Sequence, residues 1–371
     1  MRVLLLSKAF VVGAYQRKLE ALAACPGLEL TAVTPPSWRD QRGLLTLERA
    51  YTSGYRLVVT PVRFNGRFHL HYYPRLAAVL AEARPDLVHV DEEPYNFATW
   101  HAQRLARRAG AKTVFFSWQN LRRAYPWPFS AFEREVLRHA DAGIAGNQDA
   151  VAVWRAKGYT GLLSVIPQVG VDPDLFAPDP APAARDVFTI GFAGRFVPEK
   201  GVDLLLRAAA QLPGEARVRV LGAGPELPRL ARLAADLGLA ACVSFAQVSS
   251  LDMPAQLAAL DCLVLPSRTR PNWKEQFGRV LIEAMACGVP VIGSTCGEIP
   301  HVIGAAGLIF AEDDAAALAA HLRALQADPA RRAALGAAGR ARVLAHYTQA
   351  QVARATAALY RQVLTAPGLP A

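Results

Sequence analysis

The strongest constraint on the fold is an alternation of short apolar segments with helical patterns, which runs twice along the chain. In the first half, RVLLLS, LELTAVT, PDLVHVD and KTVFFSW have the length of buried strands, and stretches between them, such as YQRKLEALAA and ATWHAQRLARRAG, have helical spacing. Buried strands separated by helices of about ten to fifteen residues are typical of parallel βαβ units. This half is therefore predicted to form a doubly wound α/β sheet, with its ligand site at the carboxyl ends of the strands.

The alternation stops in a proline-rich, aperiodic segment at residues 170–186, GVDPDLFAPDPAPAARD. Such a composition suits a connection between domains, and 371 residues exceed the usual size of a single hydrophobic core. Strand and helix patterns resume at VFTIGFAG, and the last helix is expected at about residues 349–364. We therefore expect an N-terminal domain over residues 1–175 and a C-terminal domain over residues 186–346, with a ligand cleft between them.

The formal net charge of +10 raises the question of an anionic partner. The basic residues are spread over both halves, with no block of like charges, so no nucleic-acid partner is expected and diffuse arginine enrichment explains the charge. A basic patch for phosphate or for an anionic membrane surface stays open.

Cysteine usage and hydropathy favour a cytoplasmic protein. The cysteines form no CxxC pair, and most lie among apolar neighbours, as small core residues do. No uncharged apolar run reaches the length of about eighteen residues that a transmembrane helix needs. The five cysteines are Cys25, Cys242, Cys262, Cys287 and Cys296.

The segment GRFVPEKG follows a predicted strand and opens a helix, where unpaired amides and a partial positive charge suit phosphate. Arg195 adds a planar fork of donors and Lys200 a compact cation, so the two together match a diphosphate. A solvated loop before an ordinary helix is the alternative. The segment is not a P-loop, because Gly201 follows Lys200 where a P-loop has Ser or Thr.

Two glutamates lie in the apolar segment KEQFGRVLIEAMACGVPVIGS. A helix is expected from about Gly278 to Gly288, which places Glu275 just before it and Glu283 in its middle. A carboxylate without partners among apolar side chains costs several kcal/mol or becomes protonated, so Glu283 requires partners. A nucleotide ribose offers two adjacent hydroxyls, and an arginine or amide of the chain itself is the alternative. Backbone amides near Phe277 would face an anion.

These segments resemble the retaining family-4 glycosyltransferases. GRFVPEKGVDLLL, LGAGPELPRLARLAADLGL, LDCLVLPS and EQFGRVLIEAMACGVPVIG are similar to the donor domain of that family, and VIPQVGVDPDLFAP is similar to its interdomain connection. YTQAQVARATAALYRQVL resembles the closing helix that crosses back to the first domain. The resemblance implies the GT-B architecture, in which two Rossmann-like domains face each other across a cleft and a helix at about 347–371 completes the N-terminal domain.

The resemblance also implies a reaction, the transfer of a sugar from a nucleotide diphosphate sugar to an acceptor hydroxyl, without a metal or another cofactor. Arg195 and Lys200 match the pair that binds the donor diphosphate and stabilises it as a leaving group. Glu275 matches the acid near the donor sugar hydroxyls, and Glu283 matches the acid that holds the ribose. Gly13 lies in the loop where the family brings backbone close to phosphate, but without the usual second glycine. The implied donor-binding set is Gly13, Gly194, Arg195, Lys200, Glu275, Gln276, Phe277, Gly278 and Glu283.

The acceptor side departs from the family pattern. Many relatives have a histidine after the KTVFFSW strand, whereas this chain has Trp118, Gln119 and Asn120 there. In the loop VDEEPYN, Glu92 and Glu93 follow a third acid, and mutual repulsion raises the pKa of one of them. Glu93 is therefore a candidate to orient the acceptor hydroxyl or take its proton. A solvated acidic loop is the alternative.

Two further segments carry weaker signals. NGRFHLHYYPR, residues 65–75, mixes basic and aromatic residues that suit a sugar chain or an anionic lipid surface, or a plain loop before a helix. DPD at residues 172–174 resembles a metal-binding motif but lies in the connection, so we expect a turn, and no His or Cys cluster suggests zinc.

The expected acceptor is a glycan, a lipid-linked sugar or a small molecule, and peripheral contact with an anionic membrane fits a cytoplasmic enzyme of this kind. A non-hydrolysing nucleotide-sugar epimerase of the same architecture and an inactive binding module are the alternatives.

Overall fold

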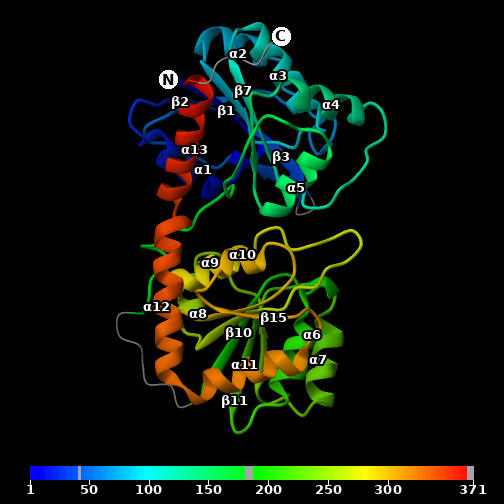
Figure 1. Cartoon of the computed structure of the whole chain (residues 1–371), viewed down its shortest axis with the longest axis vertical. Helices are drawn as coiled ribbons and strands as arrows, with labels where there is room; N and C mark the ends of the chain where they lie inside the picture. Colours follow the sequence, from blue (N-terminus) through cyan, green and yellow to red (C-terminus); the bar gives the residue numbers. More distant parts are fainter. Residues whose placement is uncertain (41–42, 180–186, 366–371) are drawn as a thin grey trace. The chain divides into compact units, whose positions relative to one another are not determined.

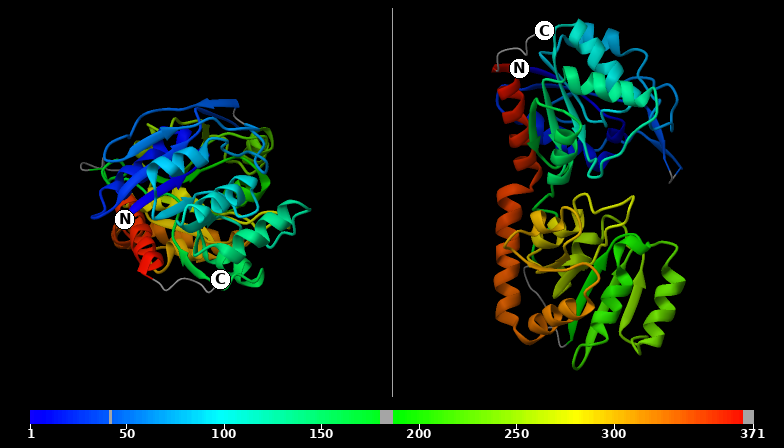
Figure 2. Two further views of the ribbon diagram at one scale, coloured as in Figure 1. Left: turned by 90° about the horizontal axis from the view of Figure 1, so that it is seen from above. Right: turned by 45° about the vertical axis from the view of Figure 1, so that its right-hand side comes forward.

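The computed structural model describes residues 1–40, 43–179 and 187–365 and divides the chain into two compact units (Figure 1). Unit 1 contains Met1–Gly170 and the chain from Gln349 onward, and unit 2 contains Val171–Thr348. Each unit is a Rossmann-like α/β fold with helices on both faces of a parallel sheet (Figure 2). The fold class predicted from the sequence is therefore confirmed for each unit.

Unit 1 has a seven-stranded sheet in the order β5-β2-β1-β6-β7-β8-β9. All neighbouring strands are parallel. The strands are β1 (Arg2–Leu6), β2 (Glu29–Thr34), β5 (Arg56–Val59), β6 (Leu87–Val90), β7 (Lys112–Ser117), β8 (Ala142–Ala145) and β9 (Leu162–Val165). The helices are η1 (Lys8–Val11), α1 (Gly13–Ala23), α2 (Leu76–Ala83), α3 (Phe97–Arg108), α4 (Phe129–His139), α5 (Gln148–Ala156) and α13 (Gln349–Thr365). A hairpin of β3 (Ser37–Asp40) and β4 (Gly43–Thr46), which the sequence patterns did not predict, lies outside the sheet.

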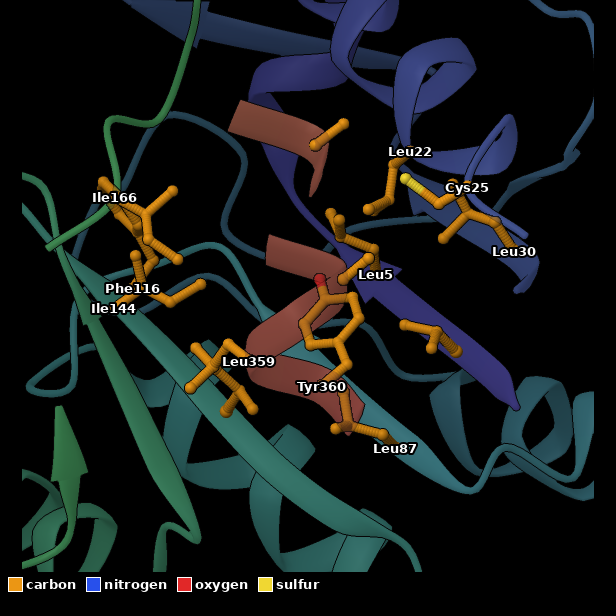
Figure 3. Close-up of a cluster of buried hydrophobic side chains, with 14 of the residues drawn as sticks. Leu5, Leu22, Cys25, Leu30, Leu87, Phe116, Ile144, Ile166, Leu359 and Tyr360 are labelled. Carbon is orange, nitrogen blue, oxygen red and sulfur yellow. The ribbon is translucent and has the colours of Figure 1, made fainter. Parts of the chain in front are cut away.

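Strand β1 shows how the sequence pattern builds this core. Successive side chains of a strand point to opposite faces of its sheet, so Leu4 and Leu5 enter different apolar clusters. The cluster with Leu5 also contains residues of α1 and α13, and Figure 3 shows Leu359 and Tyr360 of α13 among side chains of the sheet. The C-terminal helix is thus part of the hydrophobic core of unit 1, and the Tyr360 hydroxyl lies 2.6 Å from Nδ1 of buried His89.

Unit 2 has a six-stranded parallel sheet in the order β12-β11-β10-β13-β14-β15. The strands are β10 (Phe188–Ala193), β11 (Ala216–Leu221), β12 (Val243–Ala246), β13 (Cys262–Leu265), β14 (Val291–Ser294) and β15 (Leu308–Phe310). The helices are η2 (Pro198–Lys200), α6 (Val202–Ala209), α7 (Leu227–Asp236), α8 (Met253–Ala258), α9 (Arg279–Ala286), α10 (Ile299–Ile303), α11 (Ala315–Ala327) and α12 (Pro329–His346).

The unit boundary differs from the predicted one by a few residues. The sequence extended the first domain to residue 175, but the chain from Val171 belongs to unit 2. The Val171 amide donates a hydrogen bond to the Tyr347 carbonyl, and the buried side chain of Phe176 packs in unit 2. The DPD segment is a turn as expected, because the Asp172 carboxylate accepts hydrogen bonds from the amides of Asp174 and Leu175 at 3.0 and 3.4 Å. Residues 180–186 of the predicted linker lie outside the described residues.

The cysteines behave as predicted. All five are free thiols, and four of them are buried. None of the helices in the described part of the chain combines the length and the apolar character that crossing a bilayer requires.

Candidate functional site

In the sheet of unit 2 the strand order reverses between the neighbouring strands β10 and β13, which makes this the topological switch point. Ligands of doubly wound sheets bind at such a switch point, outside the carboxyl ends of the strands. Lys200 follows β10 and Glu275 follows β13, and the Lys200 ammonium lies 2.5 Å from Oε2 of Glu275. Both side chains are largely buried. The Ser267 hydroxyl donates to the same glutamate oxygen at 2.9 Å, and the Trp273 ring lies 5.0 Å from the ammonium. The structure therefore brings two of the predicted site residues into direct contact.

Two glycines allow the backbone to approach closely around this pair. Gly201 has φ +66°, and a Cβ there would lie 2.0 Å from the Pro266 carbonyl oxygen. Gly297 has φ +56°, and a Cβ there would lie 2.1 Å from the Glu275 carbonyl oxygen. Only glycine fits these positions without displacing backbone, so the loops that carry the lysine and the glutamate are held against their neighbours.

Arg195 follows Gly194 at the carboxyl end of β10 and is exposed. Its guanidinium makes no ion pair or side-chain hydrogen bond with any residue in the described part of the chain. Arg195 therefore differs from Lys200, because its charge is not already neutralised by a carboxylate.

Helix α9 forms as predicted. Gly278 caps its amino end with φ +78°, and Gly288 has φ +72° just beyond its carboxyl end. Glu283 lies in the middle of the helix, and its carboxylate is 2.8 Å from Nε of Arg279, one turn earlier. Burial raises the pKa of Glu283, and the Arg279 charge opposes that shift. The partner of this carboxylate in the structure is thus an arginine of the chain, the alternative that the sequence left open.

The remaining donor-side residues surround the amino end of α9. Gln276 is exposed, whereas Phe277 is buried and its ring packs edge-to-face on Tyr347 at 5.8 Å. The described residues show no hydrogen bond or ion pair that joins Arg195 or Glu283 to the Lys200–Glu275 pair.

Unit 1 repeats the arrangement at its own switch point, between β1 and β6. Lys8 follows β1 and Glu92 follows β6, and their side chains form an ion pair that is almost fully buried. The Lys8 amide also donates to the Glu92 carboxylate at 3.2 Å, and His71 Nε2 lies 3.7 Å from it. Burial alone would raise the pKa of Glu92, but Lys8 and His71 lower it to about 2. In both units a lysine after the first strand thus holds a glutamate from across the switch point.

Glu93 is held differently from its neighbour. Its carboxylate accepts hydrogen bonds from the Ser117 hydroxyl at 2.6 Å and from the Trp118 amide at 2.9 Å. Burial is the main cause that raises the pKa of Glu93 to about 7; these hydrogen bonds and the Lys8 charge oppose it, and the Glu92 charge adds least. The prediction that one of the acids has a raised pKa is confirmed, but burial causes the shift more than repulsion does. The alternative of a solvated acidic loop is wrong.

The other predicted acceptor residues lie beside Glu93. The Trp118 indole donates to Gln168 at 2.9 Å. Gln119 and Asn120 are buried, and the Gln119 amide group donates to the Leu121 carbonyl at 3.0 Å. Gln119 and Asn120 therefore support the loop after β7, whereas partly exposed Trp118 lies at the surface of the site.

Gly13 begins helix α1, but its amide donates to the Glu48 carboxylate at 2.6 Å. A Cβ at Gly13 would lie 2.8 Å from that carboxylate. A chain carboxylate therefore occupies the position where the resemblance placed phosphate.

Sequence reasoning missed the lysine, the serines and the arginine that hold the predicted acids in place. A usable signal was present for three of them, because polar residues that follow or end a buried apolar strand lie at the ligand-binding edge of a parallel sheet. The three with this signal are Lys8, Ser117 and Ser267, and the fourth missed residue is Arg279 on α9. In the described parts of the chain, no group of three or more His, Cys, Asp or Glu side chains is arranged to hold a metal ion.

Two Rossmann-like α/β units in one chain are the building blocks of the GT-B class of glycosyltransferases, and comparison with known families agrees. Residues 12–168 match the family described as the glycosyl transferase 4-like domain, and residues 178–342 match glycosyl transferases group 1. Together the two matches cover most of the chain. The chain therefore belongs to the GT-B glycosyltransferases of family 4.

Two relatives are named as sugar transferases. The chain is 35% identical over 257 residues to the GDP-mannose-dependent alpha-(1-6)-phosphatidylinositol monomannoside mannosyltransferase of Mycolicibacterium smegmatis, a match that covers 64% of this chain and 66% of the relative. It is 36% identical over 186 residues to the D-inositol 3-phosphate glycosyltransferase of Mycobacterium tuberculosis, a match that covers 46% of this chain and 37% of the relative. The chain thus spans less than two thirds of the length of these relatives.

Solved structures support the fold over the whole chain. Sucrose-phosphate synthase from Thermosynechococcus elongatus is similar with a TM-score of 0.73 and 22% identity, covering 99% of this chain and 100% of the other. HepE from Anabaena, in complex with UDP, has a TM-score of 0.76 and 20% identity, covering 98% and 100%.

Proposed function

We propose that this chain is a retaining, metal-independent glycosyltransferase that moves a sugar from a nucleotide diphosphate sugar to an acceptor hydroxyl. The observation that carries the proposal is the Lys200–Glu275 pair at the switch point of unit 2. It holds a cation at the edge of the sheet where such folds bind nucleotides. Family membership supports a transferase, and the GDP-mannose named for one relative makes that sugar nucleotide the first donor to test.

The proposed chemistry follows from charge. Breaking the bond between sugar and phosphate builds negative charge on the departing diphosphate, and fixed cations that interact more strongly with that charge lower the barrier. Arg195 is exposed and able to bind two phosphate oxygens at once, and Lys200, five residues later in the sequence, supplies a compact charge. Two such cations supply the stabilisation for which other enzymes use a metal ion.

The acids have separate roles in this proposal. Glu275 fixes the Lys200 ammonium and accepts a hydrogen bond from Ser267, and its carboxylate is the proposed acceptor for the donor sugar hydroxyls. Glu283 accepts hydrogen bonds from the ribose hydroxyls, and the Arg279 charge opposes the burial that raises the pKa of this carboxyl.

On the acceptor side, Glu93 is the candidate proton acceptor. A pKa of about 7 leaves about half of these carboxyls ionised at neutral pH, which suits a general base. The acceptor is a glycan, a lipid-linked sugar or a small molecule with a free hydroxyl.

Binding measurements test the donor site. Arg195→Met and Lys200→Met should each weaken binding of a nucleoside diphosphate about tenfold or more, because each removes a charge-assisted hydrogen bond worth about 1.5–3 kcal/mol. Affinity for the uncharged nucleoside should not change. Arg207→Met is the matched control, since Arg207 is exposed on α6 of the same unit. Equal affinities for wild type and both site variants would remove these residues from the donor site.

Product analysis tests the reaction. Incubation with donor and acceptor should give a glycoside whose anomeric configuration, read by NMR, is that of the donor. Inverted configuration contradicts the retaining mechanism. A changed donor sugar without transfer would instead identify an epimerase, and donor binding without turnover on any acceptor would identify a binding module.

A further inference from the structure

Three neighbouring segments of unit 1 expose large apolar side chains, which we call the apolar rim: Leu44, Phe64, Phe68, Leu70 and Trp127. The hairpin of β3 and β4 is fixed to the second segment, because the Asn65 side chain bonds the Arg39 amide at 2.9 Å and the Ser37 carbonyl at 3.0 Å. The third segment joins them through His69, whose ring lies 5.2 Å from Phe129 and 6.1 Å from Tyr125. These segments, which are far apart in sequence, therefore form a contiguous surface.

The charge around the rim is mainly positive, because the hairpin adds exposed Arg39 and half-buried Asp40 to two segments that have no acids. Residues 61–75 and 118–132 contain five arginines and no aspartate or glutamate. All five arginines are exposed in the structure. They are Arg63, Arg67, Arg75, Arg122 and Arg123. A surface that combines exposed aromatic and leucine side chains with an excess of arginine over acids is complementary to an anionic lipid bilayer, whose headgroups attract the cations while the apolar side chains insert.

The loop that carries Phe64 in the rim has a defined, hydrogen-bonded backbone conformation. Phe64 adopts the left-handed conformation with φ +56°, which is costly for a bulky side chain. Hydrogen bonds between Arg63 and Tyr72, and from the Arg67 amide to the Phe64 carbonyl, close the loop that carries it. Within the chain the Phe64 ring contacts Tyr72, with 6.3 Å between ring centroids, yet 60% of Phe64 stays exposed. An apolar phase outside the chain would cover that exposed surface.

The rim also adjoins the acceptor edge of unit 1. The Phe68 ring lies 4.6 Å from the Lys8 ammonium, which pairs with Glu92 next to Glu93. A surface that binds through Phe68 is thus in direct contact with the charged cluster at the switch point.

We propose that the apolar rim and its arginines dock unit 1 on an anionic membrane surface. This proposal does not rest on the proposed transferase reaction, and its test requires no substrate. A glycan is a poorer fit as the occupant, because residues 61–75 and 118–132 offer leucines and arginines but no carboxylates to accept hydrogen bonds from sugar hydroxyls.

Vesicle co-sedimentation of the full chain tests the proposal. Wild type should pellet with vesicles that contain phosphatidylglycerol, pellet much less with pure phosphatidylcholine, and dissociate at high salt. Phe64→Ser combined with Trp127→Ser should reduce partitioning about tenfold or more, since both side chains lose apolar insertion. Arg63→Glu with Arg67→Glu should abolish the preference for anionic lipid.

Leu251→Ser is the matched control for the apolar variants, because Leu251 in unit 2 is 84% exposed and Trp127 is 81% exposed. It should bind vesicles like wild type, and unchanged thermal unfolding shows that the rim variants remain folded. No pelleting of wild type at low salt overturns the proposal, as does binding that the rim substitutions leave intact. Binding to an immobilised oligosaccharide that depends on Trp127, without vesicle binding, would assign the rim to glycans instead.

Discussion

Glu93 provides the sharpest test of the electrostatics described above, because its pKa is raised from 4.5 to about 7 in the folded chain. The folded state therefore holds this proton more tightly than the unfolded state does. Below pH 4.5 both states are protonated, so the group does not make the free energy of unfolding depend on pH. As the pH rises from 4.5 to about 7, the unfolded state loses its proton first, so the free energy of unfolding falls, and above about pH 7 the loss is constant.

The magnitude follows from the size of the shift. A difference of about 2.5 pKa units corresponds to about 3 kcal/mol at 1.36 kcal/mol per unit. We treat this value as an upper bound, because part of the Glu93 residue reaches solvent. Replacing the carboxyl with an amide, Glu93→Gln, removes the titration but keeps a similar shape between Ser117 and the Trp118 amide.

The assay is urea unfolding of wild type and Glu93→Gln over the range from about pH 5 to about pH 8, where the linkage acts. The variant should gain stability relative to wild type as pH rises, by up to about 3 kcal/mol. A constant offset from imperfect hydrogen bonding of the amide does not affect this slope.

Glu92→Gln is the control, because the pKa of that neighbour is lowered to about 2. Its stabilisation is complete above pH 4.5 and disappears as pH falls toward 2, so the variant should be destabilised by a constant amount across the same range. Parallel stability curves for wild type and Glu93→Gln would refute the reasoning, since they would mean that Glu93 titrates as an ordinary exposed acid.

Four further outcomes follow from the structure. Glu93→Gln should lower turnover at least tenfold with donor affinity kept, a typical loss for a general base, and unchanged turnover would remove Glu93 from the mechanism. Gly201→Ala should destabilise the chain by about 3 kcal/mol or more, because its Cβ would meet the Pro266 carbonyl, whereas Gly214→Ala, with φ +68° and open space, should cost only about 1–2 kcal/mol. Tyr360→Phe should cost about 1–3 kcal/mol in thermal unfolding, because buried His89 loses its partner. EDTA should leave transfer unchanged, and loss that added Mg²⁺ restores would contradict the proposed role of the two cations.

Much of the fold was predictable because it depends on local patterns. Alternating buried strands and helices indicate parallel βαβ units wherever they occur, and both sheets are parallel as predicted. The glycines at 278 and 288 marked the ends of α9 because each adopts a positive φ that other residues avoid. The hairpin of β3 and β4 was missed because its short strands lack that alternation and pair only with each other.

The candidate site was predictable in its residues but not in its contacts. Glu283 was correctly expected to need a partner, because an apolar surrounding disfavours a lone carboxylate. The identity of the partner, Arg279, depends on side-chain geometry along the helix. Lys8 was overlooked. Its position after an apolar strand indicates the ligand-binding edge of the sheet, but the sequence does not show that it meets an acid 84 residues away.

The sequence by itself determined that the chain forms two α/β units and which charged residues lie at the carboxyl ends of their strands, because those properties follow from local periodicity and from the positions of glycine. Only the tertiary structure decided that Lys8 pairs with Glu92 and Lys200 with Glu275. The physical reason is strand order. These residues meet because β1 lies beside β6, and β10 beside β13, and that adjacency is fixed by packing of the whole sheet rather than by any segment of it.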